Sequence, residues 1–432
     1  MAEKKISELT AKGAAVATTD LMVISEVSGA SYVTKSVTGA NIKALVTDAN
    51  MTTSDITTND VSTSKHGFAP KAPNDATKFL RGDGTWAVPS AGGLTYFTEA
   101  QSTASPNATV NVDSLTAVAS TTNADVAIVP KGAGALTLAI PDSTATGGNK
   151  RGANSVDLQT TRNAASRVAS GANSVVLGGT SNTASNSNTI AGGSSSTASG
   201  NQSVALINGT ASNTSAIAIG SNVTASGVSS VSIGSDNNVA SSDYAVALGY
   251  NHTASGQGSF CVGMGNIANG SRSTALGNSS HTFGIFGRFA YSSGQESTSG
   301  DSQASKFVLR ERTTGNTATT ITTDSGAAST TNQVILSNQS AYRFKGSIVG
   351  KQSGSVNSAV WDIDGFIVRG ANAAATTLNV SNVTLVENTP AWGTPTLAAD
   401  TTNGGLRVQV TGATTTNIQW TAVIDTTEVI YA

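Results

Sequence analysis

Two carboxylates in the C-terminal part of the chain are the residues best suited to hydrolytic chemistry. Asp362 and Asp364 stand two residues apart in the phrase VWDIDGF. Glycoside hydrolysis uses two carboxyl groups roughly 5 to 9.5 Å apart, one as an acid and one as a base or nucleophile. Residues two apart on a strand share one face, so strand alternation alone explains the pair. The sequence shows no Gly-x-Ser-x-Gly, His-Glu-x-x-His or phosphate-loop pattern, and we expect a solvated strand face and no enzymatic activity.

A tryptophan in a proline-containing loop is the candidate ligand-binding residue. Trp392 lies in NTPAWGTP, between Pro390 and Pro395. Exposed aromatic residues in loops often bind ligands, which makes Trp392 the candidate receptor-binding residue. The alternative is a ring folded back over its own domain or into a seam between chains. Trp361 and Trp420 lie in alternating segments and are expected in the core.

Histidine and cysteine are common metal ligands, and the chain has three histidines and one cysteine. Their spacing argues against a shared site. His66, His252 and His281 are far apart, and none is paired with Cys261. We therefore expect no metal and no cofactor, with a ring of three His66 side chains from three chains left open. A lone cysteine forms no internal disulfide, so Cys261 is expected to be a neutral side chain of the repeat described below.

One tripeptide, Arg81-Gly82-Asp83, spells a cell-adhesion signal. Three residues recur by chance, and here they belong to the longer phrase FLRGDGTW. Asp-Gly is a turn signal, so we expect a turn rather than an adhesion site.

The composition is typical of a fibrous β protein. Charged residues make up 12% of the chain, against a usual share of ~25%, while Gly, Ser, Thr, Ala and Asn dominate. The net charge is −2 and no basic patch is dense, so we expect no nucleic-acid partner. The sequence shows neither a signal-peptide core nor a run of ~18 apolar residues, so we expect a chain made in the cytoplasm without its own export signal.

An internal repeat organises the middle of the chain. Its phrase runs Ala-Ser-Gly, a polar pair, an apolar-x-apolar triplet and a Gly, and the copies begin at Ala169, Ala184, Ala198, Ala211, Ala225, Ala240, Ala254 and Ala268. The steps are 13 to 15 residues long, so the period is close to 14. A unit of this size buries almost nothing alone, whereas stacked coils pair each strand with its equivalents. The repeat therefore predicts a parallel β-roll of about eight coils.

Three columns run through the copies. Apolar residues recur six and eight positions after each marker alanine, as in Ile217 and Ile219, and we expect both columns to face inward. Glycine recurs at the ninth position, where it permits a corner of positive φ, as Gly178, Gly193, Gly220, Gly234, Gly249, Gly263 and Gly277. Two small inward groups per coil make a thin core, so we expect the roll to need partner chains.

The repeated forms ASG…SVAL and ASN…AIAIG resemble the head repeats of trimeric autotransporter adhesins. The period, the glycine position and the apolar offsets agree together, although the copies at Ala184 and Ala198 are degenerate. The resemblance covers about a quarter of the chain. It implies three left-handed rolls packed about a threefold axis.

The parts before the repeat differ from it in composition. Residues 1–46 predict a hairpin, with strands at 21–25 and 32–37, followed by a short helix at 40–46. Residues 47–65 are a polar linker, and residues 66–90 form a joint with an apolar plug. The first segment and the joint, which holds HGF and FLRGDGTW, resemble the virion-attachment segment and a trimeric joint of bacteriophage tail fibres. A small capping domain is the alternative for residues 1–46.

Four further segments complete the organisation. Residues 91–148 alternate with period two and predict a small β shoulder module. The roll spans 149–282, and its first coil is charged, with Lys150, Arg151, Asp157 and Arg162, which would keep the end of the solenoid from exposing a sticky edge. Residues 283–304 form an aromatic neck that plugs the other end. Seven alternating runs in residues 305–432 predict an antiparallel sandwich or jelly roll.

These features predict an all-β, fibrous homotrimer with a left-handed parallel β-roll of about eight 14-residue coils, flanked by small β modules and a C-terminal antiparallel β-sandwich. The sandwich also resembles C-terminal modules of phage tail fibres. The resemblance implies a tail fibre of the virion, docked on tail or baseplate proteins by its N-terminus and binding a host surface glycan or outer-membrane protein. A bacterial trimeric surface adhesin is the main alternative, which would need a secretion signal and a membrane-anchoring barrel. A polysaccharide-depolymerising tailspike is the second alternative.

Overall fold

A computed structural model describes residues 21–28, 31–38, 40, 73–89, 97–103, 110, 112–118 and 122–431. The chain divides into two units, residues 1–127 and 128–432. Regular structure in the described residues is nearly all β, with helical structure limited to short pieces such as the 3-10 helix η3 (Ala373–Ala375). Within the described ranges, no helix has the length and apolar character needed to cross a membrane. The predicted linker at 47–65, most of the predicted helix at 40–46, and His66 lie outside the described residues.

The described residues of the first unit form three short hairpins. β1 (Leu21–Ser28) pairs antiparallel with β2 (Ser31–Thr38), which confirms the predicted N-terminal hairpin. β5 (Phe97–Ser102) pairs antiparallel with β6 (Val112–Ala117).

The adhesion-like tripeptide lies in the turn of the remaining hairpin of this unit. β3 (Phe79–Leu80) pairs with β4 (Trp86–Ala87). Between them, the Asp83 carboxylate accepts hydrogen bonds from the backbone N–H of Thr85 (3.0 Å) and from its hydroxyl (2.7 Å). These bonds lower the pKa of Asp83. The expected Asp-Gly turn is confirmed.

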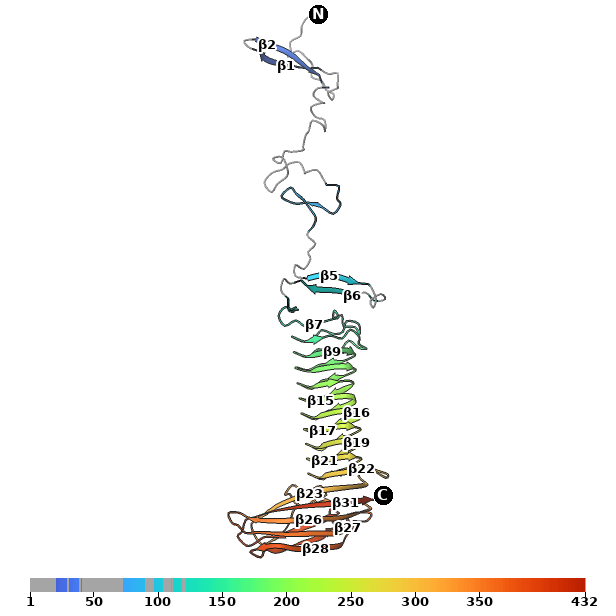
Figure 1. The fold of residues 1–432 in the computed structure, drawn as a ribbon, viewed down its shortest axis with the longest axis vertical. Helices are drawn as coiled ribbons and strands as arrows, with labels where there is room; N and C mark the ends of the chain where they lie inside the picture. The colour runs from blue at the N-terminus through green and yellow to red at the C-terminus, as the bar shows by residue number, and fades with distance from the viewer. Residues whose placement is uncertain are drawn as a thin grey trace. The chain divides into compact units, whose positions relative to one another are not determined.

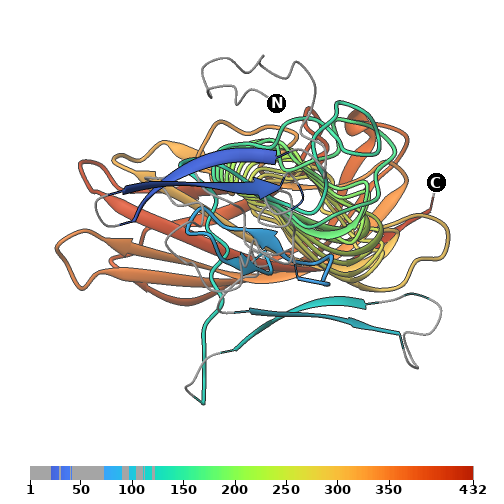
Figure 2. The same cartoon turned by 90° about the horizontal axis from the view of Figure 1, so that it is seen from above.

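A parallel solenoid forms the first part of the second unit (Figure 1). The strands of its first parallel ladder are β7 (Leu136–Thr137), β8 (Val156–Asp157), β9 (Val175–Thr180), β11 (Ile190–Ser194), β13 (Val204–Leu206), β15 (Ile217–Ala225), β16 (Val231–Ala240), β17 (Val246–Tyr250), β19 (Phe260–Met264), β21 (Thr274–Asn278) and β22 (Phe289–Ser293). Each residue pairs with its equivalent one coil later, as Ile217 does with Val231. Seen along the column, the coils overlie one another (Figure 2). The predicted β-roll of about eight coils is confirmed, and the ladder already begins at β7, before residue 149.

A second parallel ladder closes the other side of the coils. It consists of β10 (Thr183–Ala184), β12 (Thr197–Ala198), β14 (Gly209–Ala211), β18 (Thr253–Ala254) and β20 (Ile267–Ala268), together with the second halves of β15 and β16. Each coil is therefore a flattened loop of two strands. The space between two such strands is narrow, which decides what fits inside.

The predicted facing of the apolar columns is wrong. The fully buried positions are the marker alanines and the small residues at the seventh position, namely Val176, Ala191, Ala205, Ala218, Ser232, Ala247, Cys261 and Ala275. The sixth and eighth positions point out of the coil, and Leu177 is 57% and Ile233 38% exposed. Side chains alternate along a strand, so a shift of one position exchanges the two faces. The narrow interior accepts the small residues and leaves the bulky ones outside.

A buried polar column lines one corner of the interior. Asn182, Asn238 and Asn266 occupy the position two residues before a marker and are fully buried. Each side-chain amide donates to two carbonyls, as Asn266 Nδ2 does to Val262 (2.8 Å) and Gly277 (2.8 Å). Each amide oxygen accepts a backbone N–H from the next coil. The column thus satisfies backbone groups that the corner leaves without strand partners.

The repeat glycines have the positive φ that the sequence predicts. Gly234 has φ +142°, and a Cβ there would lie 1.7 Å from the carbonyl oxygen of Gly249 in the next coil. Gly178 also has positive φ, but the nearest atom to its Cβ would be 3.7 Å away. Glycine is therefore required at Gly234 for close stacking as well as for backbone conformation.

The solenoid continues directly into a two-sheet sandwich, because β22 pairs parallel with β21 and antiparallel with β23 (Ser302–Thr313). The larger sheet has the antiparallel order β23, β31 (Ile418–Ile430), β26 (Ser340–Gln352), β27 (Ser358–Arg369) and β28 (Thr376–Thr389). The smaller sheet contains β24 (Ala318–Thr320), β25 (Val334–Ile335), β29 (Gly393–Asp400) and β30 (Gly405–Thr411). All seven predicted strands are present, and β24 and β29 were not predicted.

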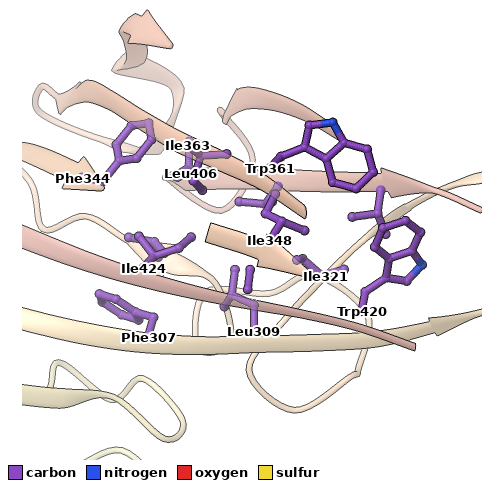
Figure 3. Close-up of a cluster of buried hydrophobic side chains, with 14 of the residues drawn as sticks. Phe307, Leu309, Ile321, Phe344, Ile348, Trp361, Ile363, Leu406, Trp420 and Ile424 are labelled. Atoms are coloured by element: carbon purple, nitrogen blue, oxygen red, sulfur yellow. The ribbon is translucent and has the colours of Figure 1, made fainter. Parts of the chain in front are cut away.

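The sandwich has a large apolar core, unlike the roll. Figure 3 shows Phe307, Phe344, Trp361 and Trp420 among the buried side chains between its sheets. Trp361 and Trp420 are 1% and 0% exposed, which confirms their expected place in the core. The Trp420 ring lies 6.1 Å from that of Trp361.

Candidate functional site

The two candidate carboxylates lie on the solvent side of the larger sheet. Asp362 and Asp364 alternate on β27 with the buried Trp361 and Ile363. Asp364 forms an ion pair with Arg343 on the adjacent strand, with an N to O distance of 2.9 Å. The expected solvated strand face is confirmed.

Trp392 does not form an exposed binding surface. Its side chain is 6% exposed, and its ring packs edge-on against Trp420 at 5.6 Å. Asn388 closes the loop, because its side chain accepts a hydrogen bond from the backbone N–H of Trp392 (2.8 Å) and donates one to the Trp392 carbonyl (2.8 Å). The candidate receptor-binding role of Trp392 is therefore corrected to a core role. The loop bends back because the domain is more stable with the large indole ring buried than with it exposed to water.

His252 and Cys261 are separate, buried side chains of the solenoid, and His281 is half-buried. His252 takes the place of asparagine in the polar column, with Nε2 3.1 Å from the Leu248 carbonyl and Nδ1 accepting the Asn266 N–H (3.1 Å). Burial lowers the pKa of His252. Burial raises the pKa of Cys261 to about 12, so the thiol is neutral as expected. The described ranges contain no group of three or more His, Cys, Asp or Glu side chains that could hold a metal ion.

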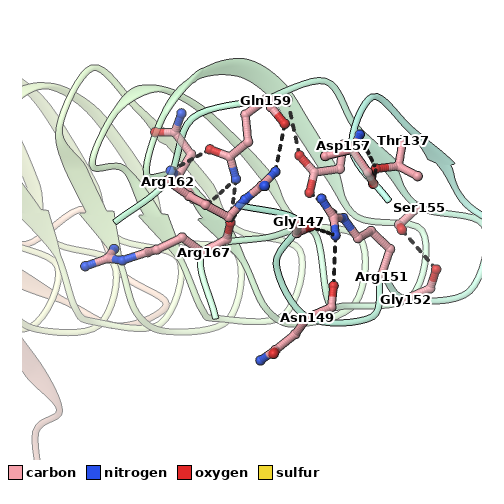
Figure 4. A network of polar contacts seen from close by, with 12 residues as sticks. Thr137, Gly147, Asn149, Arg151, Gly152, Ser155, Asp157, Gln159, Arg162 and Arg167 are labelled. Carbon is pink, nitrogen blue, oxygen red and sulfur yellow. Dashed lines mark hydrogen bonds and ion pairs between the residues drawn. The ribbon is translucent and has the colours of Figure 1, made fainter. Parts of the chain in front are cut away.

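The charged residues of the first coil lie inside the solenoid rather than on its edge. Arg151, Asp157 and Arg162 are at most 7% exposed, and only Lys150 of the four is exposed. Arg151 pairs with Asp157 at 2.7 Å, and Arg162 donates to the Gln159 carbonyl at 2.8 Å (Figure 4). Asp157 occupies the seventh position, where later coils have a small residue. The network fills the first coils with polar groups, most of them hydrogen-bonded, while Arg151 Nη2 has no hydrogen-bond partner among the described residues.

A buried ion pair joins the solenoid to the sandwich. Arg288, just before β22, is 0% exposed and pairs with Glu428 of β31, which is 1% exposed. Glu428 also accepts from the side chains of Gln303 (2.8 Å) and Thr426 (2.6 Å). The Arg288 guanidinium lies 5.2 Å from the ring centres of both Phe283 and Phe307. The predicted aromatic neck thus packs around a buried ion pair instead of forming a purely apolar plug.

The outward columns of the solenoid form one uncharged and largely apolar surface, here called the outer stripe. Its members are Leu136, Val156, Val175, Leu177, Ile190, Val204, Leu206, Ile217, Ile219, Val231, Ile233, Val246, Leu248, Phe260, Val262, Thr274, Leu276, Phe289 and Tyr291. No member is charged. Ten steps between β7 and β22, at about 4.8 Å each, give a length of roughly 48 Å. An apolar surface of this extent marks an interaction site.

A polar cleft of about 550 Å³ lies at one end of the larger sheet. It is formed where β23 and β26 end and β31 begins. Its lining includes Arg312, Lys351, Gln352, Asn417, Gln419 and Thr421, and no acidic residue. Arg312, Gln419 and Lys351 stand in one row across three neighbouring strands.

Sequence reasoning missed both surfaces. The sequence holds one hint of the outer stripe, because the seventh position is Ala, Ser or Cys in seven of the eight repeat copies while bulky residues recur on either side of it. The cleft left no local signal, because Arg312, Lys351 and Gln419 come from three separate segments. Only the strand register brings them into one row.

No protein-family model and no curated protein matches the sequence. Among solved structures, the chain is similar to a tailspike protein of Acinetobacter baumannii bacteriophage Fri1, described as a capsular polysaccharide depolymerase. The identity is 8% and the TM-score 0.20, and the match covers 63% of this chain and 44% of the tailspike chain. This chain therefore spans less than half of the length of that protein. At these values the likeness assigns no activity to this chain.

The comparison contradicts the expectation of no enzymatic activity, because the matched tailspike is an enzyme, but it assigns no particular activity to this chain. The expectation relied on the lack of short hydrolase motifs and on one pair of nearby carboxylates. Glycosidase carboxylates are defined by their separation in space, and they can come from distant segments. A motif search along one sequence does not detect such a pair.

Proposed function

We propose that the chain is a receptor-binding component of a bacteriophage tail, in which three copies associate through their solenoids and present the C-terminal sandwich to the host surface. In this proposal the N-terminal segment docks on tail or baseplate proteins. The sandwich binds a host surface glycan or outer-membrane protein. The support from sequence is the resemblance to tail-fibre segments and to trimeric head repeats.

The outer stripe is the observation that carries the proposal. After the first coils, the interior holds mainly alanine, serine and asparagine, so the large apolar side chains that would stabilise an ordinary domain lie on the surface of the solenoid. Burying apolar area stabilises by about 25 cal/mol per Å². A stripe without charges, continued over eleven strands, gains this stabilisation only when another apolar surface covers it.

The regular spacing of the stripe favours further copies of the same chain as its partner. Bulky residues recur in two columns, and the coils that carry them rise by about 4.8 Å each. A partner fits all coils at once only if its own residues have the same rise. Identical copies arranged about an axis parallel to the column meet this condition, because every coil then faces its own counterpart. The number three follows from the resemblance to trimeric head repeats.

Light scattering of the full chain, combined with analytical ultracentrifugation, tests the assembly. We expect the mass of three chains for the natural protein. The double variant Ile219→Asp, Ile233→Asp should give folded monomers, because charges on the stripe cannot be covered by an apolar partner. Thr253→Asp is the matched control, since Thr253 is an exposed residue of the short-strand face. A folded natural monomer, or a trimeric stripe variant, would overturn the proposal.

Incubation of the trimer with candidate host cells tests the receptor-binding half. A fragment starting at residue 122 should still bind cells, because the proposal places recognition in the sandwich. Loss of binding by a correctly trimeric fragment would reverse the assignment of the two ends. New reducing ends in the same incubation would show that the bound polysaccharide is also cut.

A further inference from the structure

We infer that the cleft at the end of the larger sheet is a binding site for an acidic saccharide, with Arg312 and Lys351 as its two cationic contacts. This inference rests on the proposed function, because it names the ligand class of the same host-facing sandwich. It goes beyond that proposal by specifying a site and a chemistry. Three observations support it: unpaired cations, a lining of amides and hydroxyls, and a rigid floor.

The two cations of the cleft differ from two others on the same sheet face, which are paired with carboxylates. Lys306 pairs with Asp425, and Arg343 pairs with Asp364. Within the described part of the chain, neither Arg312 nor Lys351 forms an ion pair. The Lys351 ammonium donates to the backbone carbonyls of the β26–β27 turn, including that of Ser355, which holds it beside the cleft. Positive charge without a carboxylate partner attracts an anionic ligand.

The rest of the lining fits the hydroxyl groups of a sugar. Gln352, Asn417 and Gln419 offer amide donors and acceptors, and Thr421 adds a hydroxyl. Arg312 and Lys351 flank Gln419 across two strand spacings, so their backbones are about 10 Å apart. This separation matches a ligand longer than a single small anion. A saccharide with acidic groups along its length meets both cations and the amides between them.

The floor of the cleft is held by the tryptophan core. Gly350 precedes Lys351, and a Cβ at Gly350 would lie 2.5 Å from the Trp420 ring. Trp420 is fully buried, donates through Nε1 to the Thr313 hydroxyl (2.9 Å) and packs against Trp392. Both ends of the cationic row therefore lie directly above a packed, hydrogen-bonded core. A preorganised site loses little conformational freedom on binding.

Calorimetric titration of the full chain with acidic oligosaccharides tests the site. The probes are oligogalacturonate, oligosialic acid and a sulfated galactan oligosaccharide, with carboxyl-reduced oligogalacturonate as the neutral counterpart. We expect binding of at least one acidic probe that weakens as salt is raised, and no binding of the neutral counterpart. The acidic probes distinguish carboxylate from sulfate as the recognised group.

A matched pair of variants locates the binding. The double variant Arg312→Gln, Lys351→Gln should weaken binding at least about tenfold, which corresponds to roughly 1.4 kcal/mol. The control double variant Arg310→Gln, Lys345→Gln removes the same charge from the same sheet, at positions outside the lining. It should bind within about twofold of the natural protein. All four side chains are exposed, so both variants should keep their circular dichroism and melting temperature.

The outcomes separate this inference from the proposed function. Equal weakening by both double variants would overturn the cleft, because it would show general attraction by the sheet. Absence of binding to all acidic probes at millimolar concentration, by a trimer that still adheres to host cells, would overturn the acidic saccharide and leave the proposed function standing. Binding by a protein that stays monomeric would support the cleft and overturn the proposed assembly.

Discussion

The solenoid and the sandwich solve the problem of burial in opposite ways. In the solenoid, each coil encloses small residues such as Ala218 and Ser232 and leaves Ile219 and Ile233 outside. In the sandwich, alternation places residues such as Phe307 and Trp420 inside and charged residues outside. The same period-two pattern therefore has opposite meanings in the two regions. The distance between facing strands decides which side chains can be interior.

The two regions therefore differ in how far they depend on partner chains. The sandwich closes its own core from two sheets and leaves a mostly polar outer face. The solenoid satisfies its backbone through two ladders and the asparagine column, but it leaves its largest apolar groups uncovered. We therefore expect mutations in the sandwich core to act within one chain. Mutations on the outer stripe should act on assembly.

The largest effect should come from the sandwich core. Trp420→Ala removes a fully buried indole and the packing of Trp361 and Trp392 against it. We expect a loss of about 3–5 kcal/mol in the free energy of unfolding. Differential scanning calorimetry of the full chain should show a lower sandwich transition. The stripe variant Leu248→Ala should instead weaken assembly and keep the sandwich transition, and a similar shift by both variants would contradict the contrast.

The next largest effect should separate two glycines of the solenoid. Gly234→Ala forces a Cβ to 1.7 Å from a carbonyl oxygen of the next coil, in addition to a strained φ. Gly178→Ala has the same kind of φ strain, but its Cβ would lie 3.7 Å from the nearest atom, the Leu158 carbonyl oxygen. We expect a loss of about 3 kcal/mol or more for Gly234→Ala and about 1–2 kcal/mol for Gly178→Ala. Denaturant unfolding followed by circular dichroism measures both, and equal losses would mean that coil stacking does not require the glycine.

A smaller effect should measure how narrow the interior is. Ala218→Leu adds three carbons at a seventh position that is 0% exposed, and overpacking of this kind costs about 1–3 kcal/mol. Ile219→Leu, on the neighbouring outward position, keeps the volume and should leave the solenoid transition unchanged. Thermal melts of the two variants provide the comparison. An unchanged melt for Ala218→Leu would show that the coils can widen.

The smallest effect should be a dependence on pH. The pKa of His252 is lowered by burial, and that of His281 is lowered to about 4. The unfolded chain therefore binds protons that the folded chain does not, so stability is complete above about pH 6.5 and falls as the pH decreases toward the folded pKa values. His252→Asn restores the residue of the neighbouring coils and should reduce this loss. Melting temperatures at pH 7 and pH 5 test it, and an equal loss in both proteins would remove His252 from the explanation.

Residue spacing along the chain predicts the local features of the fold. The 14-residue period, the positive-φ glycines, the N-terminal hairpin and seven strands of the sandwich could all be read from residue spacing. These features depend on backbone conformation and on alternation, which act over a few residues. They do not depend on which elements later meet.

The packing of distant segments sets which side chains face the interior and which face solvent. The inward side of the coil depends on how closely two strands approach, and a repeat pattern with residues on both faces fits either choice. Trp392 is buried because its loop reaches the core formed by other segments. Arg288 and Glu428 meet across 140 residues, and Arg312, Gln419 and Lys351 meet through strand register. Such contacts are set by the packing of distant segments, which residue spacing along the chain does not encode locally.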